Sequence, residues 1–263
     1  MLMKAEIGII GGTGVYDPKF LKNCEEMKVE TPYGLPSDAI IVGELNGRTV
    51  AFVPRHGRKH TIRPTDVNFR ANIHALKELG VQWILAPSTV GSLREEYKPG
   101  DIVFVDQFID RTTRREESFY TGPKVVHIGV AEPTCPTLRK ILAEIADGMK
   151  IGYHKTGTYV CIEGPRFSTK AESKMFRGWS ADVVGMTLVP ECVLAREAEI
   201  CYASVATVTD YDVWKDHPVS AGEIVRTMRA NIEKVKQLLM EAVARIPKES
   251  ECECKDELKK ALV

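Results

Sequence analysis

The sequence lacks any long apolar run and any excess of charge of one sign. None of its hydrophobic stretches approaches the roughly 18–20 residues that a membrane-spanning helix needs. Its 36 Lys and Arg balance 36 Asp and Glu, whereas nucleic-acid binders carry surplus cations that displace phosphate counterions. The first residues place Glu6 before the first apolar stretch and lack a secretory layout. We therefore expect a soluble cytoplasmic protein that binds neither membranes nor nucleic acid.

Cysteine spacing typical of zinc ligands is also missing. The seven cysteines include no CxxC pair and no Cys/His cluster with such spacing, so we expect no metal site. Cys252 and Cys254 form a CxC pair in a charged tail, where they are either redox-active or two exposed thiols. Disulfides inside cells are common only in hyperthermophiles.

Strand signals and helix signals alternate along the chain, which is the pattern of an α/β layered fold. The predicted strands are 7–10, 39–45, 48–53, 81–86, 102–105, 157–162, 181–184 and 200–208. The predicted helices are 66–79, 134–146, 169–176, 190–199 and 220–246. Because Asn46-Gly47 predicts a hairpin, the sheet should be mixed. We predict one domain over 1–246 and a tail over 247–263 that is helical or mobile.

A strand that breaks into three glycines forms the first candidate site. Residues 8–14 read GIIGGTG, and glycines let backbone N–H groups approach an anion such as phosphate. A dinucleotide-binding loop would need glycine at position 17, which is Asp17, and no P-loop lysine follows. The segment is therefore either a phosphate-binding turn, with Thr13 as a hydroxyl donor, or an ordinary tight turn.

Cations concentrate in residues 54–64, which hold four Lys or Arg and two His without an acid. His56 and His60 stand four residues apart, but the neighbouring guanidinium groups would repel a divalent metal ion. Arg55 offers a planar fork that matches phosphate oxygens, and a histidine adds a donor. We favour an anion site at this strand end over a solvated basic loop.

Two further segments place flat or acidic side chains at a strand end. Phe167 and Ser168 suit a flat aromatic ligand, although a buried Phe beside a helix cap is the alternative. Asp210 and Asp212 follow an apolar strand, where α/β folds bind ligands, and a raised pKa would let one of them donate a proton. Acidic turn residues are the alternative here. An anion pocket and a base pocket one sugar apart would suit nucleoside phosphorolysis.

These motifs together resemble the 5′-methylthioadenosine phosphorylases of the purine nucleoside phosphorylase superfamily. Matching runs cover nearly the whole chain up to about Ile246; they include GIIGGTG at 8–14, RHGR at 55–58, DQFIDRTT at 106–113, IEGPRFS at 162–168 and TDYD at 209–212. The resemblance implies the α/β/α nucleoside phosphorylase sandwich and a pentosyltransferase without a cofactor, which uses inorganic phosphate as co-substrate. It also implies a homotrimer or a dimer of trimers. The tail follows the archaeal thermophilic members, which hints at disulfides.

The resemblance implies roles for single residues as well. The residues that would hold phosphate are Thr13, Arg55, His56, Ser88 and Thr187, with Thr89 beside them through its backbone. The residues that would contact the nucleoside are Met186 at the ribose, Phe167 and Ser168 at the base, Asp210 at N7 and Asp212 at the six-position amine. His127 would reach into the site of a neighbouring subunit. Asp210 would act as the general acid that protonates the departing purine.

The implied reaction converts 5′-methylthioadenosine and phosphate to adenine and 5-methylthioribose-1-phosphate, with adenosine as a further substrate. The alternative within the superfamily is a broad or 6-oxopurine phosphorylase acting on inosine, guanosine or methylthioinosine; relatives of that kind typically carry Asn where Asp210 stands. Pro218, Ala221 and Gly222 near the expected 5′ pocket are small, which would leave that pocket more open. The alternatives from other functional classes are a nicotinamide oxidoreductase and a non-catalytic nucleoside-binding module.

Overall fold

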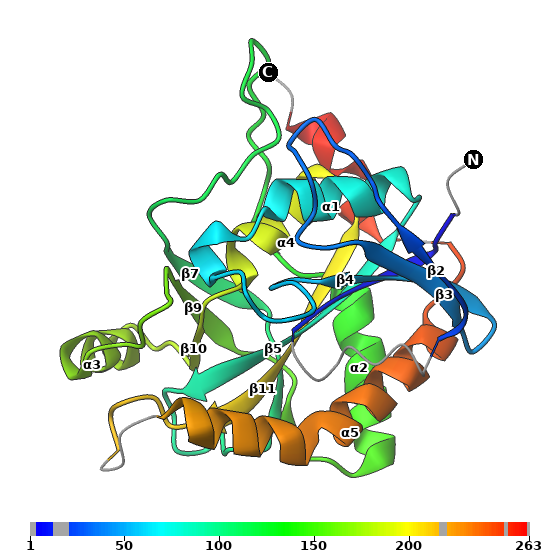
Figure 1. The fold of residues 1–263 in the computed structure, drawn as a ribbon. Helices are drawn as coiled ribbons and strands as arrows, with labels where there is room; N and C mark the ends of the chain where they lie inside the picture. Colours follow the sequence, from blue (N-terminus) through cyan, green and yellow to red (C-terminus); the bar gives the residue numbers. More distant parts are fainter. Residues whose placement is uncertain (1–3, 13–20, 216–219, 250–251, 262–263) are drawn as a thin grey trace.

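The computed structural model describes residues 4–12, 21–215, 220–249 and 252–261, with the backbone alone at Glu223. One mixed sheet of 11 strands runs through this part of the chain, and helices cover both of its faces (Figure 1). The predicted three-layer α/β/α sandwich is confirmed. Within the described residues, no helix combines the length and the apolar character that crossing a membrane would require.

The sheet is built around one long central strand, β5. The strands are β1 (Ile7–Gly11), β2 (Lys22–Met27), β3 (Ile40–Leu45), β4 (Arg48–Pro54), β5 (Trp83–Ser92), β6 (Ile102–Phe104), β7 (Gln107–Arg111), β8 (Tyr153–His154), β9 (Thr158–Ile162), β10 (Val183–Gly185) and β11 (Cys201–Asp210). The order is β2-β3-β4-β1-β5-β10-β9-β7, with β11 joining β5 to β6 and β8 beyond β6. Parallel pairs at the centre direct several strand ends to one edge.

The Asn46-Gly47 hairpin forms as predicted. Strands β3 and β4 pair antiparallel up to Leu45 and Arg48. Asn46 and Gly47 have φ values of 50° and 73°, and a two-residue turn with positive φ at both positions matches the twist of the flanking strands. This antiparallel pair is one of the reasons that the sheet is mixed.

Side chains alternate between two cores, one on each face of the sheet. In β1, Ile7 and Ile9 enter one core and Ile10 enters the other. Helices α2 (Pro136–Met149) and α5 (Ala221–Arg245) cover the first face, while α1 (Phe69–Glu78) and α4 (Leu188–Glu197) cover the second (Figure 1). Because the central strands are buried on both faces, the segments that form them are continuous apolar runs in the sequence.

Local capping moves two helix ends away from the predicted positions. Helix α1 begins at Phe69 instead of Asp66, because the Asn68 side chain accepts from the Ala71 N–H and caps it. Helix α2 continues through Gly148 to Met149, and Lys150 ends it with φ 54°. Helix α3 (Lys170–Gly178) starts at the predicted capping box.

Most of the described part of the tail is helical. Residues Glu253–Lys260 form a short 3-10 helix, η3, and Cys254 is buried in the core that α2 and α5 cover. Glu257 pairs with Arg196 of α4 at 3.1 Å, and both side chains are largely buried. The described part of the tail therefore packs against the main body of the protein.

Candidate active site

One cavity collects nearly all of the predicted site residues. It has a volume of about 830 Å³ and lies where the ends of β4, β5, β9, β10 and β11 meet the first turns of α5. Ten of the twelve predicted residues line it: Arg55, His56, Ser88, Thr89, Phe167, Ser168, Met186, Thr187, Asp210 and Asp212. Of the other two, Thr13 lies outside the described residues and His127 is elsewhere. In particular, Arg55 and Asp210 share this cavity.

Arg55 is held almost completely by the protein. Its Nε donates to Glu191 Oε2 at 2.6 Å and its Nη2 donates to Glu191 Oε1 at 2.8 Å. Backbone carbonyls of Ile10 and Pro87 take further Nη2 and Nη1 hydrogens. The Tyr202 hydroxyl also donates to Glu191, at 2.9 Å. These contacts fix the plane of a guanidinium that is 2% exposed and that forms part of the cavity wall.

The other arginines of the cation-rich segment are paired as well. Arg58 forms bonds to Glu26 and Asp38, and Arg63 binds Asp66 at 2.6 Å. Carboxylates brought in by other parts of the fold therefore neutralise charges that look unopposed in the sequence of 54–64. Any attraction for an anion must come from directed donors at the cavity wall instead of from an unpaired patch of cations.

His56 faces the cavity as a neutral side chain. Its Nδ1 lies 3.0 Å from the carbonyl oxygen of Ile62, and because a carbonyl only accepts, Nδ1 carries the proton. Burial and, to a smaller extent, the positive charge of Arg55 lower the pKa of His56 to about 4. At neutral pH, Nε2 is therefore left with a lone pair that can accept a proton or a hydrogen bond.

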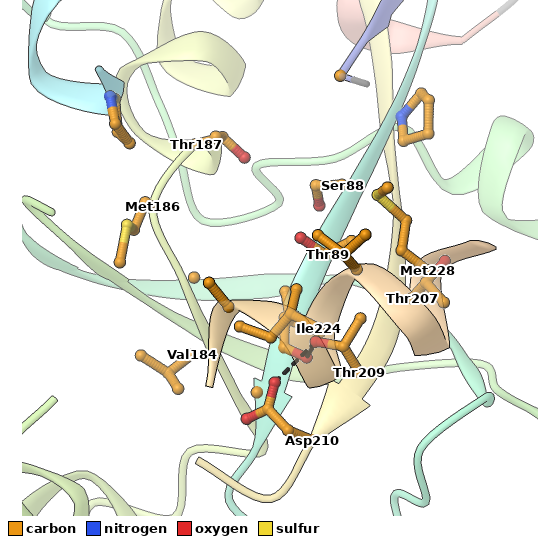
Figure 2. Close-up of a pocket in the computed structure, with 18 of the residues that line it drawn as sticks. Ser88, Thr89, Val184, Met186, Thr187, Thr207, Thr209, Asp210, Ile224 and Met228 are labelled. Carbon is orange, nitrogen blue, oxygen red and sulfur yellow. Dashed lines mark hydrogen bonds between the residues drawn. The ribbon is translucent and has the colours of Figure 1, made fainter. Parts of the chain in front are cut away.

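Hydroxyl groups gather at the same end of the cavity. Ser88 lies on β5, and its buried Oγ has no hydrogen-bond partner among the described residues. Thr187 precedes α4, and its N–H donates to the hydroxyl of the buried Tyr159. Figure 2 shows Ser88 and Thr187 toward the top of the cavity and Asp210 toward the bottom. A Cβ at Gly185 would lie 2.1 Å from the Tyr159 hydroxyl, so glycine is required at that position.

Asp210 is held at the opposite end by two hydrogen bonds. The backbone N–H of Asp212 donates to Oδ1 at 2.8 Å, and the Thr209 hydroxyl donates to Oδ2 at 2.7 Å (Figure 2). A Cβ on Gly91 would come within 3.0 Å of Oδ1, so the glycine of β5 leaves room for the carboxylate. Both carboxyl oxygens of Asp210 therefore accept a hydrogen bond from the protein.

Asp212 is only 5% exposed, and burial raises the pKa of its carboxyl. The hydroxyls of Ser173 and Ser168 lie nearby and limit this shift, although none of these groups reaches standard hydrogen-bond geometry. Oδ2 of Asp212 and Oγ of Ser168 are buried without a partner among the described residues. Because buried polar groups are normally paired, these two atoms are available to a ligand.

Asp210 and Asp212 do not lie on one extended strand. Asp212 has a φ of 47°, and the pairing of β11 with β5 shifts register between Val208 and Asp210. A turn, in which the Asp212 N–H closes on the Asp210 side chain, brings both carboxyls to the cavity. The two side chains face the same space for a different physical reason than strand alternation.

Apolar side chains form the remaining walls. Phe167 lines the cavity yet is 42% exposed, so its ring stands at an open part of the wall. Met186 packs over Gly164, whose added Cβ would lie 2.5 Å from the methionine sulfur. Ile224 and Met228 come from α5 (Figure 2).

The sequence analysis missed most of this α5 wall, along with Thr207 and Thr209. The apolar spacing of 224, 228 and 232 was visible, but it reads equally well as core. Of the residues predicted near the 5′ pocket, Ala221 lines the cavity and Gly222 does not. Pro218 lies outside the described residues.

His127 is not part of the cavity wall of its own chain. Its backbone N–H donates to the carbonyl of Ala261 in the tail at 2.9 Å. The segment between β7 and α2, drawn in green in Figure 1, extends away from the sheet.

A cluster with metal-like geometry lies elsewhere. In the described part of the chain, the one group of metal-ligating side chains consists of Cys135, Cys201, Cys252 and Cys254. The spacing of the cysteines in the sequence does not indicate this group, because the fold brings the tail to two distant cysteines. None of the four lines the cavity.

Comparison with known proteins places the chain in a family. A model of the phosphorylase superfamily matches residues 6–244, so the chain belongs to that superfamily, and the predicted enzyme class is confirmed. The S-methyl-5′-thioadenosine phosphorylase of Pyrococcus horikoshii is 57% identical over 261 residues, which cover 98% of this chain and 99% of the relative.

Solved structures agree with this assignment. A methylthioadenosine phosphorylase from an Antarctic soil metagenomic library has a TM-score of 0.94 at 47% identity, covering 99% of this chain and 93% of its own. A variant of the adenosine/methylthioadenosine phosphorylase from Schistosoma mansoni, in complex with methylthioadenosine, has a TM-score of 0.91 at 40% identity, with 98% and 96% covered. The predicted nucleoside phosphorylase fold is therefore confirmed.

Proposed function

We propose that this chain cleaves the N-glycosidic bond of 5′-methylthioadenosine with inorganic phosphate. The products are adenine and 5-methylthioribose-1-phosphate, and adenosine is a further substrate. The observation that carries the proposal is the single cavity in which Arg55, His56 and Ser88 lie together with Asp210 and Asp212. Relatives that share about half of the sequence are named for this activity. The 6-oxopurine alternative is not favoured.

Phosphate is held at the end of the cavity where Arg55, His56, Ser88 and Thr187 lie, with Thr13 and the backbone of Thr89 as further donors. Arg55 keeps an Nη1 hydrogen for it, while Glu191 fixes the orientation of the guanidinium. Neutral His56 accepts the proton of bound hydrogen phosphate at Nε2. The Ser88 hydroxyl, unpartnered among the described residues, gains a hydrogen bond when the anion enters.

Bond cleavage creates opposite charges on the two products. The sugar becomes cationic as the bond to the purine breaks, and the bound phosphate stabilises it before attacking its anomeric carbon. The purine departs with negative charge, which a proton delivered to N7 removes. Asp210 supplies this proton. Because both oxygens of Asp210 accept hydrogen bonds from the protein, Asp210 must acquire the proton when the nucleoside binds.

The base end favours a 6-aminopurine. Asp212 Oδ2 lacks a partner among the described residues and accepts a hydrogen bond from the exocyclic amine. A 6-oxopurine would present a carbonyl to this carboxylate, and two acceptors repel each other. A site that accepts a hydrogen bond from an exocyclic amine can strongly reject a base that carries a carbonyl at the same position. Phe167 stacks on the base, Ser168 bonds near it, and Met186 lies against the ribose.

The same proposal includes a homo-oligomer, either a trimer or a dimer of trimers. His127 does not line its own cavity and belongs to a segment that extends from the sheet (Figure 1). This position supports its reaching the nucleoside site of a neighbouring subunit. The cytoplasmic location and a disulfide stay predictions; under oxidising conditions the cluster of Cys135, Cys201, Cys252 and Cys254 is where a disulfide would form.

The test is an assay of free base. Protein is incubated with 5′-methylthioadenosine, adenosine or inosine, each with and without phosphate. Adenine release that requires phosphate and yields 5-methylthioribose-1-phosphate supports the proposal. Release without phosphate would make the protein a hydrolase, and release from inosine but not from methylthioadenosine would overturn the substrate assignment.

A further inference from the structure

Four cysteines that are distant in the sequence meet at the edge of the core. The Sγ atoms of Cys135, Cys201, Cys252 and Cys254 all lie within 4.8 Å of one another. Cys252 Sγ is 3.8 Å from Cys135 Sγ and 2.8 Å from Cys201 Sγ. No disulfide joins any of the cysteines that the structure describes. We call this group the cysteine cluster.

The spacing of the sulfurs suits a tetrahedral metal ion. Structural Zn²⁺ sites commonly consist of four cysteines with Zn–S distances of about 2.3 Å, so the sulfurs of such a tetrahedron are roughly 3.8 Å apart. The separation between Cys135 and Cys252 equals this value at 3.8 Å, and no pair exceeds 4.8 Å. The 2.8 Å between Cys201 and Cys252 would widen by about 1 Å on binding. With four sulfurs and no oxygen or nitrogen ligand, the set selects a soft, thiophilic cation and not Mg²⁺ or Ca²⁺.

Backbone hydrogen bonds hold two of the four ligands, Cys135 and Cys201, in place. The Cys135 N–H donates to the carbonyl of Tyr202 at 2.8 Å, and the Cys201 N–H donates to that of Gln82 at 3.0 Å. Helix α2 begins directly after Cys135, so its positive end stabilises a thiolate there. Cys135, Cys201 and Cys254 are almost completely buried among apolar residues of the core, which excludes water from the site. Partly buried Cys252 leaves a path for entry.

The other two ligands come from the tail. Cys252 and Cys254 flank the first residue of η3, and this helix reaches the body through the Arg196–Glu257 pair. At its far end, the Ala261 carbonyl accepts from the N–H of His127. Fixing the two tail cysteines therefore also steadies the segment that carries His127.

We propose that the cysteine cluster, in its reduced form, binds one Zn²⁺ ion per chain through four thiolates and thereby fastens residues 252–261 to the body of the protein. The ion is structural, because none of the four cysteines lines the cavity and the tetrahedron leaves no open position for a substrate. The site is therefore independent of the phosphorolysis proposed above. Oxidation to disulfides would consume the same sulfurs and exclude the metal.

The test uses the full chain, reduced with a phosphine, freed of metal and kept without oxygen. Intact mass first establishes that the cysteines are thiols. Co²⁺ alone is then titrated in, because its absorption reports tetrahedral thiolate coordination. We expect saturation at one Co²⁺ per chain and displacement by one equivalent of Zn²⁺. Because the ion binds only the folded chain, Zn²⁺ should also raise the Tm.

Matched variants separate the cluster from adventitious binding. Cys252→Ser should weaken Co²⁺ binding by roughly 100-fold or more, since a ligand is lost. Cys24→Ser, an exposed cysteine on β2, should bind as the unaltered chain does. Phosphate-dependent base release by Cys252→Ser would show that this variant is folded. Absence of the thiolate spectrum, equal effects of both substitutions, or disulfides that persist under the phosphine would each overturn the proposal.

Discussion

The two ends of the cavity are prepared for their ligands in different ways. At the Arg55 end, the two basic side chains are already engaged, Arg55 by Glu191 and His56 by a carbonyl, and Ser88 Oγ lacks a partner among the described residues. At the Asp212 end, the Asp212 and Ser168 oxygens are buried without partners among the described residues. The first end is ordered before an anion arrives, while the second gains hydrogen bonds when a base arrives. Affinity at one end therefore depends on orientation, and discrimination at the other depends on unsatisfied polar atoms.

The largest effect should follow from removing the acid at the base end. Asp210→Asn keeps the shape of the side chain but cannot donate a carboxyl proton, so kcat with methylthioadenosine should fall by about 10²–10⁴-fold. Steady-state kinetics at neutral pH measure this. Asp256→Asn, in the tail, should leave kcat unchanged. Undiminished turnover by Asp210→Asn would contradict the acid role.

A pH-dependent loss of stability should mark the Arg55 end. His56 has a pKa of about 4 in the folded protein, below its ordinary value near 6.5. The unfolded chain therefore takes up the proton first, so stability is fully present above about pH 6.5 and is lost as pH falls toward 4. The contribution amounts to roughly 3 kcal/mol.

Urea unfolding between pH 7 and pH 4 tests this comparison. His56→Gln should show a shallower acid loss of unfolding free energy than the unaltered chain. Ser88→Ala, which alters the same end without a titratable group, should keep the full slope. Parallel curves for His56→Gln and the unaltered chain would rule out the contribution of His56.

Disturbing the orientation of Arg55 should weaken the binding of phosphate much more than the binding of the nucleoside. In Glu191→Gln, the amide N–H₂ group faces the guanidinium donors and the charge partner is lost. We expect the KM for phosphate to rise about 10–100-fold, a cost of roughly 1.4–2.8 kcal/mol, with a much smaller change in the KM for methylthioadenosine. Tyr202→Phe removes only the hydroxyl bonded to Glu191 and should have a weaker effect. An equal rise of both KM values would mean general disruption.

The smallest effect concerns the α5 wall. Met228→Ala removes an apolar contact at the cavity, and if this wall surrounds the 5′ substituent, the preference for methylthioadenosine over adenosine should fall roughly 5- to 20-fold in kcat/KM. Glu233→Ala, exposed on the same helix, serves as the control. An unchanged ratio for Met228→Ala would place the 5′ substituent against another wall.

Local features of the fold and site could be predicted because their causes lie close together in the sequence. The hairpin depends on Asn46-Gly47, and the start of α3 depends on Thr169 and Glu172. The candidate segments likewise follow strands, and the parallel strands β1, β4, β5 and β11 bring most of these ends to one edge. Strand β9, which Phe167 follows, runs antiparallel to β5. Six residues named from those segments therefore line one cavity, together with Ser88, Thr89, Met186 and Thr187, which only the family resemblance implied.

The missed features depend on contacts between distant parts of the chain. Glu191 is 136 positions from Arg55, and nothing in either segment indicates the pairing. The cysteine cluster joins positions 135 and 252 only because the tail returns to the start of α2. The α5 wall carries apolar spacing that core and cavity share, so only the three-dimensional arrangement distinguishes the two. Tertiary topology, and not local preference, decides all three.

Helix α5 serves the cavity and the core with different parts of its length. Its 25 residues extend about 37 Å; the opening turns contribute Ile224 and Met228 to the cavity, while Leu238 and Val243 are buried in the core. Arg48 donates to the carbonyls of Val243 and Ile246 and secures the far end. Substrate range can thus diversify through replacements in the opening turns, while the anchored half preserves the architecture on which catalysis relies.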